Sequence, residues 1–402
     1  MAKSFRSVVL LAALASQGHA PAAAVKIVTV AAGTDLQATI DANPPGTTFL
    51  LAAGNWHRQA IRPKKDDRFV GAEDGRTILT GDDVTAELAN AGSGLVGAGV
   101  LFRRITVEHY VPGFQQGAIS GVVGWTFEDC TFEHMGNSGN GLNPGADSRI
   151  IRGRFRYNAG NGIAASHADN LVIEGAEIAY NNTAHLDVDN DTGGLKITAS
   201  RNVRITNNVI HDNYGDGIWS DVHATNWMIS GNTIADNSYN GIHWETSSGA
   251  TISGNVITGN GAGKGMPMEG AAIYISSSAD ASVFGNTIVV PDGADGIIMQ
   301  TIGRPDQVIT ENNRVQYNSV TFMGPAGLNG WRSYRGGRVG RGNSFDYNRY
   351  TSARASDAHW VWGGRNAAMD WNAYRATSGQ DAGAQFMAAP TVMNAAGSST
   401  AP

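Results

Sequence analysis

The sequence of 402 residues contains 52 glycines, 12 prolines and one cysteine, and 42% of its residues are hydrophobic. This apolar content is sufficient for a large core and excludes a disordered chain, while the glycines lack the triplet period of collagen. The lone Cys130 excludes an intrachain disulfide framework and a multi-cysteine zinc site, and the net charge of −6 argues against a nucleic-acid partner.

Residues 1–20 have the layout of a secretory signal peptide. Lys3 and Arg6 form a short positive region, residues 8–15 are apolar, and Gly-His-Ala at 18–20 offers a cleavage site. Because Pro21 disfavours cleavage directly before it, the cut is expected as late as residue 24. No later run of 18 apolar residues exists, so we expect no membrane span and a secreted or periplasmic protein.

A short helix is predicted over residues 35–43 (DLQATIDAN), ahead of two prolines. The rest of the chain up to about residue 330 is dominated by a repeat of roughly two dozen residues, with a small residue followed by an aliphatic one at each step. These pairs are Gly162-Ile163, Gly194-Leu195, Gly217-Ile218, Gly241-Ile242, Ala272-Ile273 and Gly296-Ile297. The helix is therefore expected to cap the open N-terminal end of a repeat structure.

Asparagine recurs in two further columns of the same repeat. One column is Asn208, Asn232, Asn255 and Asn286, and the other is Asn158, Asn181, Asn213, Asn237 and Asn260. An amide at one position of every coil predicts a structural ladder that bonds to the coils above and below, since Asn also tolerates the αL bend of a turn.

Short strands punctuated by Gly and Asn at this period predict an all-β fold, a right-handed single-stranded parallel β-helix over residues 25–330. Residues 331–402 lose the period and are rich in Trp, Tyr and Arg. We expect them to form an irregular C-terminal cap and tail rather than a second domain.

Alternation along each strand separates core residues from residues that point away from the core. The first outward column is Ala164, Lys196, Trp219, His243 and Tyr274, and the second is Ser166, Thr198, Asp221, Glu245, Ser276 and Gln300. The residues between them are mostly apolar, which supports this register. A lysine, two aromatic rings, a histidine and two carboxyls thus gather on adjacent coils.

Asp221 and Glu245 are 24 residues apart, which is one coil. Neighbouring strands lie about 4.8 Å apart, so the two carboxyls are expected at roughly 5 Å, the spacing of retaining glycosidases. Repulsion at this distance favours a proton on one of them, which is the pairing of an acid with a nucleophile. The alternative is two solvated charges on a sheet face.

Other residues of the columns are candidates for binding and support. Trp219 and Tyr274 suit stacking on a sugar ring, or packing against an inserted loop. Lys196, Thr198 and His243 are candidates to bind hydroxyls or to tune the carboxyls, and Lys196 is equally explained as a surface lysine.

The inserted segment at 187–193 (DVDNDTG) alternates acidic residues before a glycine. Asp187, Asp189 and Asp191 are candidate calcium ligands, because calcium takes oxygen ligands in loose geometry; the alternative is an acidic loop that caps its own turns. The segment does not complete an EF-hand, since its twelfth position is Thr198 rather than Glu.

The motifs G-I-W-S-D at 217–221 and G-I-H-W-E at 241–245, with residues 45–81, resemble secreted bacterial right-handed parallel β-helix repeat proteins of the pectate-lyase-like superfamily. A narrower similarity is to β-helix retaining β-xylosidases. That resemblance implies that Asp221 is the nucleophile and Glu245 the acid/base.

Three functions follow as hypotheses. The leading one is a retaining glycoside hydrolase that acts on a polysaccharide or oligosaccharide and requires no cofactor. The second is a calcium-dependent polysaccharide lyase or epimerase on a uronan, with Lys196 or His243 as the base. The third is a non-catalytic glycan-binding or surface β-helix. The sequence leaves the sugar and the oligomeric state open.

Overall fold

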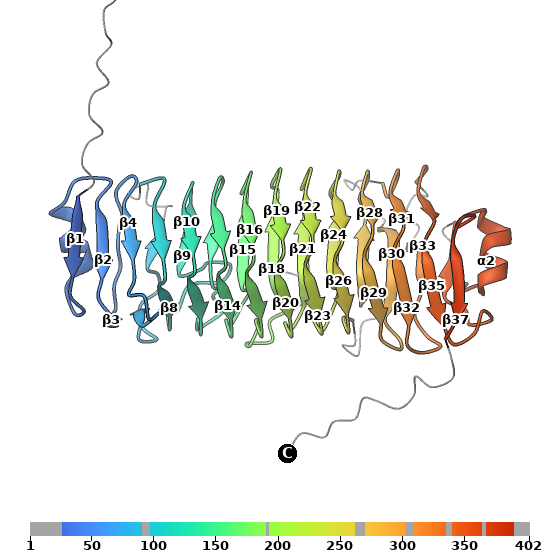
Figure 1. The fold of residues 1–402 in the computed structure, drawn as a ribbon, viewed down its shortest axis with the longest axis horizontal. Coiled ribbons are helices and arrows are strands. Elements are labelled where there is room, and N and C mark those ends of the chain that lie inside the picture. Colours follow the sequence, from blue (N-terminus) through green and yellow to red (C-terminus); the bar gives the residue numbers. More distant parts are fainter. Residues whose placement is uncertain are drawn as a thin grey trace, which may run out of the picture.

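The protein is a right-handed parallel β-helix, which confirms the predicted fold class. The computed structural model describes residues 26–90, 97–189, 193–261, 270–302, 309–334, 340–363 and 367–389. The coils stack along one long axis, and the two ends of the described chain lie at opposite ends of the stack (Figure 1). The predicted signal peptide lies outside the described residues and stays a prediction.

Three parallel faces run along the stack. The first is a 13-stranded sheet, in the order β1 (Ile27–Val30), β2 (Thr48–Leu51), β4 (Arg68–Val70), β7 (Leu101–Arg103), β10 (Thr126–Glu128), β13 (Arg149–Ile151), β16 (Val172–Glu174), β19 (Arg204–Thr206), β22 (Met228–Ser230), β25 (Thr251–Ser253), β28 (Ser282–Phe284), β31 (Arg314–Gln316) and β34 (Ser344–Asp346).

The second face is another 13-stranded sheet, in the order β3 (Gly54–His57), β5 (Thr77–Thr80), β8 (Thr106–Glu108), β11 (Thr131–Glu133), β14 (Arg154–Arg156), β17 (Glu177–Ala179), β20 (Val209–His211), β23 (Thr233–Ala235), β26 (Val256–Thr258), β29 (Thr287–Val290), β32 (Ser319–Phe322), β35 (Arg349–Ser352) and β37 (Gln385–Ala388).

The third face carries the candidate site and consists of two sheets in line. The shorter sheet has the order β12 (Asn143–Pro144), β9 (Ile119–Val122) and β6 (Ala89–Asn90). The longer sheet has the order β15 (Ile163–Ser166), β18 (Gly193–Thr198), β21 (Asp216–Asp221), β24 (Ile242–Glu245), β27 (Ala271–Ser276), β30 (Asp295–Ile302), β33 (Asn329–Tyr334) and β36 (Trp360–Val361). A bridge between Leu142 and Ile163 joins them.

The two asparagine columns form hydrogen-bonded ladders inside the coils, as the sequence predicted. Asn232 is buried, donates its amide to Asn255 Oδ1 at 3.0 Å and to the Ile205 carbonyl at 2.9 Å, and accepts from Asn208. The ladder extends through Asn318 to Asn348. Each amide thereby forms hydrogen bonds with buried main-chain groups at the turn between two strands, where these groups have no partner in a neighbouring strand.

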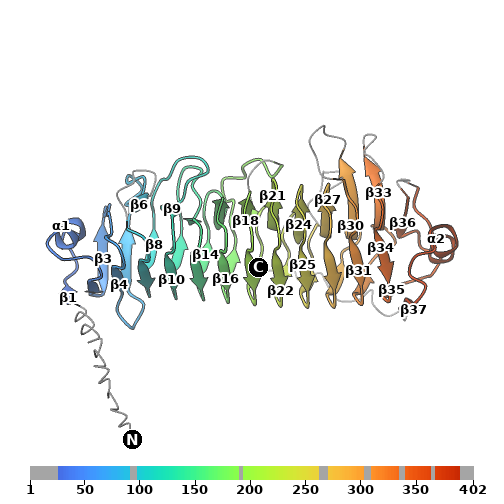
Figure 2. The same cartoon turned by 90° about the horizontal axis from the view of Figure 1, so that it is seen from above.

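Both ends of the stack are closed by a helix. The predicted N-terminal helix is α1 (Leu36–Asp41), which is capped by Asp35 and buries Leu36 and Ile40 (Figure 2). At the other end α2 (Trp371–Ser378) is capped by Asp370 and packs against the last coil. Neither end of the described stack exposes its core, which a solenoid requires. No helix in these described ranges is long and apolar enough to cross a membrane.

The coils continue past residue 330, where the sequence predicted that they end. Strand β33 pairs with β30, β34 pairs with β31, and β35 pairs with both β32 and β37. The loss of the Gly-Ile period marks a change of core residues, not the end of the coils, because Trp360, Tyr350 and Phe345 replace the aliphatic side chains there. The irregular cap is therefore confined to the segment around α2.

The asparagine ladder yields a stability prediction. Asn232→Ala leaves the Asn208 main-chain N–H, the Asn208 amide and the Ile205 carbonyl buried without their partners. We expect a loss of about 3 kcal/mol or more in the free energy of unfolding, measured by urea titration. The exposed neighbour Thr233→Ala is the control and should cost no more than about 0.5 kcal/mol. Equal effects of the two changes would contradict the structural role of the ladder.

The C-terminal cap yields a pH prediction. Burial raises the pKa of Asp381 to about 6, although Asn348, Tyr350 and Tyr374 donate to its carboxylate. Because the pKa is higher in the folded state than in the unfolded one, stability from this group is present in acid and is lost as pH rises from about 4 to 6.

Asp381→Asn removes this titration. Relative to the variant, the parent protein should lose about 2 kcal/mol of unfolding free energy between pH 4 and pH 8, as measured by urea unfolding of both proteins. A difference between the two proteins that does not change with pH would contradict the assignment.

Candidate functional site

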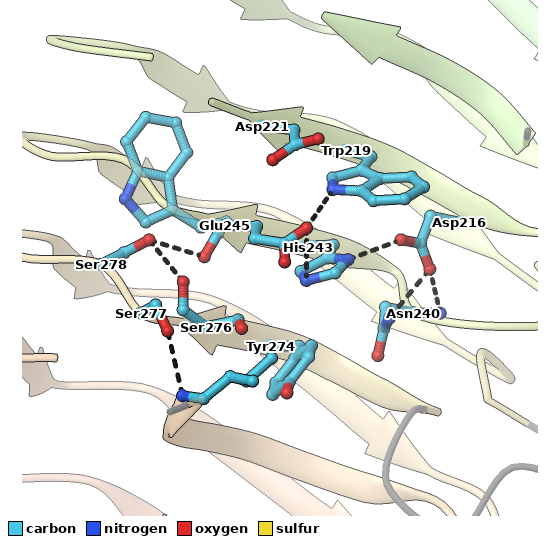
Figure 3. A network of polar contacts seen from close by, with 12 residues as sticks. Asp216, Trp219, Asp221, Asn240, His243, Glu245, Tyr274, Ser276, Ser277 and Ser278 are labelled. Carbon is cyan, nitrogen blue, oxygen red and sulfur yellow. Dashed lines mark hydrogen bonds and ion pairs between the residues drawn. The ribbon is translucent and has the colours of Figure 1, made fainter. Parts of the chain in front are cut away.

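The two outward columns of the third face have the register that the sequence predicted. Lys196 lies opposite Trp219, Trp219 opposite His243, and His243 opposite Tyr274. In the second column Thr198 lies opposite Asp221, and Glu245 opposite Ser276. The pairing of Ser220 with Trp244 places Asp221 beside Glu245 on neighbouring strands (Figure 3).

Most of these side chains point away from the core, yet they are buried. Lys196, Trp219, His243 and Tyr274 are all buried, and Glu245 is 6% exposed. Only Asp221 and Thr198 of the candidate residues on this face are partly exposed. Stacking in register covers each side chain with the next one along the column, so this face is not an ordinary solvated surface.

The first column forms one continuous stack. The Lys196 Nζ lies 3.5 Å from the centroid of the Trp219 ring, a cation–π contact. The Trp219 and His243 ring centroids are 5.1 Å apart with planes inclined by 12°, and the His243 and Tyr274 centroids are 4.8 Å apart. These separations match the spacing of about 4.8 Å between strands, so the backbone sets the stack.

Asp221 and Glu245 have different partners. The Asp221 Oδ2 lies 3.3 Å from the Lys196 Nζ, and its Oδ1 accepts from the Val222 main-chain N–H at 2.7 Å. The Glu245 Oε2 accepts from the Trp219 Nε1 at 3.0 Å and lies 3.8 Å from the His243 Nε2. The Asp221 carboxyl is therefore partly exposed and lies beside the Lys196 ammonium, whereas the Glu245 carboxyl is buried and contacts the Trp219 and His243 rings.

Asp216 is a member of this cluster that the sequence analysis missed. Its Oδ2 lies 2.9 Å from the His243 Nδ1, and its Oδ1 accepts from the Asn240 main-chain N–H and side-chain amide at 2.8 and 2.9 Å. Since a carboxylate only accepts, this geometry places the ring proton on Nδ1 and turns Nε2 toward Glu245 (Figure 3).

A signal for Asp216 is present in the sequence. The residue before each Gly-Ile pair is polar in four of the coils, namely Asn161, Asp216, Asn240 and Asp295. Strand alternation alone assigns this position to the core side, which is why it was not selected. The structure shows that the side chain of Asp216 nevertheless reaches His243 on the next coil.

A second polar network follows toward the C-terminal end of the face. Gln300 donates to the Tyr274 hydroxyl at 2.8 Å and accepts from the Arg332 Nε at 2.7 Å, and Arg332 also pairs with Asp295 at 3.0 Å. Burial raises the pKa of Asp295, and the nearby arginine partly offsets this. Arg332 and Asp295 were not predicted, because Arg332 lay in the presumed cap.

The structure leaves the calcium prediction untested. Asp187 and Asp189 are exposed, and the Asp189 N–H donates to the Asp187 Oδ1 at 3.0 Å, as in a turn that an acidic side chain caps. Asp191 lies outside the described residues. Within those residues no group of three His, Cys, Asp or Glu side chains is placed to hold a metal ion.

Comparisons with known proteins agree with the fold. The family model described as "Right handed beta helix region" matches residues 115–243, and the model described as "Periplasmic copper-binding protein (NosD)" matches residues 184–350. No curated protein sequence matches the chain. The chain is a right-handed parallel β-helix repeat protein, as its resemblance predicted.

Several solved structures share this fold at low identity. The A-module of mannuronan C-5 epimerase AlgE6 from Azotobacter vinelandii has a TM-score of 0.64 at 18% identity, over 88% of this chain and 94% of that one. XylC in complex with xylose has a TM-score of 0.61 at 11% identity, over 81% and 83%. A PL6 alginate lyase in complex with a trisaccharide has 0.56 at 14% identity, over 89% and 92%.

The lone cysteine does not fit the copper site that one family description implies. The thiol of Cys130 is buried, donates to the Glu128 carbonyl, and has a pKa raised by burial to about 12. A protonated thiol in an apolar core is not a copper ligand.

The position of the His243 proton is open to direct test. In Asp216→Asn the amide keeps an oxygen toward the two Asn240 donors and turns its NH2 toward the His243 Nδ1, which must then accept. We expect the ring proton to move from Nδ1 to Nε2, observed in ¹⁵N–¹H spectra of protein labelled at histidine. An unchanged tautomer would contradict the role given to Asp216.

Proposed function

We propose that the protein is an exported carbohydrate-active enzyme, and specifically a retaining glycoside hydrolase. The observation that supports this most is the pair formed by Asp221 and Glu245, two carboxyls on adjacent strands in unlike surroundings. Such a pair supplies a charged nucleophile and a proton donor. The strand spacing of about 4.8 Å agrees with the carboxyl separation of about 5–5.5 Å in retaining enzymes.

The proposed reaction has two displacements. In the first, an Asp221 oxygen attacks the anomeric carbon while Glu245 gives its proton to the departing glycosidic oxygen, so that a glycosyl ester forms and the aglycone leaves. In the second, Glu245 takes a proton from water, the water oxygen attacks the same carbon, and the Asp221 carboxylate is released. Overall one glycosidic bond and one water give two hydroxyl products.

The surrounding residues are proposed to support this pair. The Lys196 ammonium stabilises the Asp221 carboxylate, at 3.3 Å. The Trp219 N–H fixes the Glu245 Oε2, and His243, held by Asp216, faces the same oxygen. Tyr274 supports His243 from the far side, and the partly exposed Thr198 is a candidate contact to a sugar hydroxyl.

The contacts of Lys196 argue against this residue as the base of the lyase or epimerase alternative. A base that removes the C5 proton of a uronate must be neutral, whereas Lys196 lies between Asp221 and the Trp219 face, both of which bind the ammonium form. Calcium at Asp187, Asp189 and Asp191 remains part of that alternative. No cofactor is proposed for the hydrolase.

The class of substrate and the export of the protein are proposed from its similarities to other proteins and from its N-terminal sequence. The similar solved structures are described as enzymes or complexes of saccharides, which supports a polysaccharide or oligosaccharide substrate. Residues 1–20 and the periplasmic description of one matching family support export.

Two substitutions test the chemistry on a panel of aryl glycosides and oligosaccharides. Asp221→Asn should lower kcat/KM by about 10³-fold or more on every substrate that the parent cleaves, because the nucleophile is lost. Glu245→Gln should lower it by about 10²–10⁴-fold for poor leaving groups but much less for dinitrophenyl glycosides, which leave without a proton.

Glu174→Gln on the exposed edge of β16 is the matched control and should leave turnover unchanged. Unsaturated uronate absorbance that depends on calcium would overturn the hydrolase in favour of the lyase. Glycan binding without turnover in the parent protein, undiminished in both variants, would indicate the non-catalytic β-helix.

A further inference from the structure

A polar pocket of ≈ 240 Å³ lies on the third face, on the N-terminal side of the carboxyl pair. Its walls come from four neighbouring coils and are rich in amides and hydroxyls. They include Gln115, Asn140, Asn143, Asn161, Ser166 and Thr198, with Lys196 at the edge. This volume is far more than the roughly 10–15 Å³ that a cavity needs to hold one water molecule, so the pocket has room for a small polar molecule.

The amides of the pocket are held in place by one another. The Asn140 amide donates to the Asn143 Oδ1 at 3.1 Å, and Asn143 donates to the Gln115 carbonyl at 2.7 Å. The Asn140 Oδ1 accepts from the main-chain and side-chain nitrogens of Asn161. Fixed amides supply both donors and acceptors to a ligand at little further cost in side-chain entropy.

The pocket adjoins the carboxyl pair. Lys196 and Thr198 form its edge on β18, and this strand pairs with β21, where Thr198 lies opposite Asp221. One step between coils is about 4.8 Å, which is comparable to the length of one sugar residue in a glycan. A sugar in the pocket would therefore be the neighbour of a sugar at Asp221.

The positive charge of Lys196 at the pocket is balanced by the carboxylate of Asp221 next to it. Among the described residues that line it, Lys196 is the one that carries a charge, and its Nζ lies 3.3 Å from the Asp221 carboxylate. A uronate in the pocket would have to compete with Asp221 for this ammonium, whereas hydroxyl groups are satisfied by the amides without that cost. The lining thus suits a neutral sugar better than an acidic one.

We propose that this amide-lined pocket is a subsite that binds a neutral sugar residue of the substrate, next to the point of cleavage. The inference rests on the proposed function, since it places the substrate chain along the third face. It also makes the substrate a glycan of at least two residues, without the carboxylates of a uronan.

The test is calorimetric titration of the full-length Glu245→Gln variant, which measures binding separately from turnover. The probes are xylo-, cello- and manno-oligosaccharides of two to five residues, with oligogalacturonate as the acidic counterpart. Ala164, which lines the pocket on β15 and is partly exposed, is replaced by Trp to fill it. We expect Ala164→Trp to weaken the tightest neutral tetrasaccharide by about tenfold, the loss of one or two hydrogen bonds.

Ala235→Trp is the matched control, because Ala235 is likewise a partly exposed alanine on a strand, but on the second face. It should leave binding unchanged. Asn143→Ala is the second variant, since it removes an amide instead of adding bulk, and it should weaken binding in the same direction. Equal affinities in all variants, or tighter binding of oligogalacturonate than of the neutral probes, would overturn the subsite.

These experiments distinguish a failure of the subsite proposal from a failure of the hydrolase proposal. If the parent protein cleaves no glycoside but Ala164→Trp still weakens binding of a neutral oligosaccharide, the subsite stands and the hydrolase is wrong. If glycosides are cleaved but filling the pocket affects neither affinity nor the preference for longer chains, the hydrolase stands and the subsite is wrong.

Discussion

The molecule depends on the hydrogen bonds between successive parallel coils, which keep equivalent residues about 4.8 Å apart. This spacing is short enough for every column of side chains to be in contact along the axis. It makes a ladder of Asn208, Asn232 and Asn255 inside the coils. It also makes the stack of Lys196, Trp219 and His243 outside them. The core and the candidate site are thus two results of one repeat.

The same spacing brings ionisable side chains of neighbouring coils close together, and three carboxyls of the third face each lie beside a basic side chain. Asp221 faces Lys196, Asp216 faces His243, and Asp295 faces Arg332, each on a neighbouring coil of the third face. Side chains that point away from the core are therefore buried by their own neighbours, so that their polar groups must be satisfied locally. Glu245 is the carboxyl in this region whose contacts are a tryptophan N–H and an imidazole, which sets it apart from the others.

Much of this arrangement can be predicted from the sequence, because residues one repeat apart in the chain lie side by side on neighbouring coils. The fold, the asparagine ladders, the N-terminal helix and the register of Asp221 beside Glu245 follow from the period and from strand alternation. Two features do not follow. Asp216 reaches His243 from a position that strand alternation assigns to the core side, and the coils after residue 330 have Trp and Tyr in place of Ile and Val, which hides the period. The burial of the outward columns depends on stacking geometry, which a linear pattern does not contain.

The central claim is that Asp221 forms a covalent bond to the sugar. The most direct measurement is mass spectrometry of peptides from the protein after incubation with 2-deoxy-2-fluoro glycosyl fluorides of xylose, glucose and mannose, which slow the release of the glycosyl ester. If Asp221 is the nucleophile, a glycosyl group is expected on the peptide that contains Asp221, and no such label is expected in Asp221→Asn. A label on another carboxyl, or cleavage of the matching glycoside with inversion and no label, would contradict it.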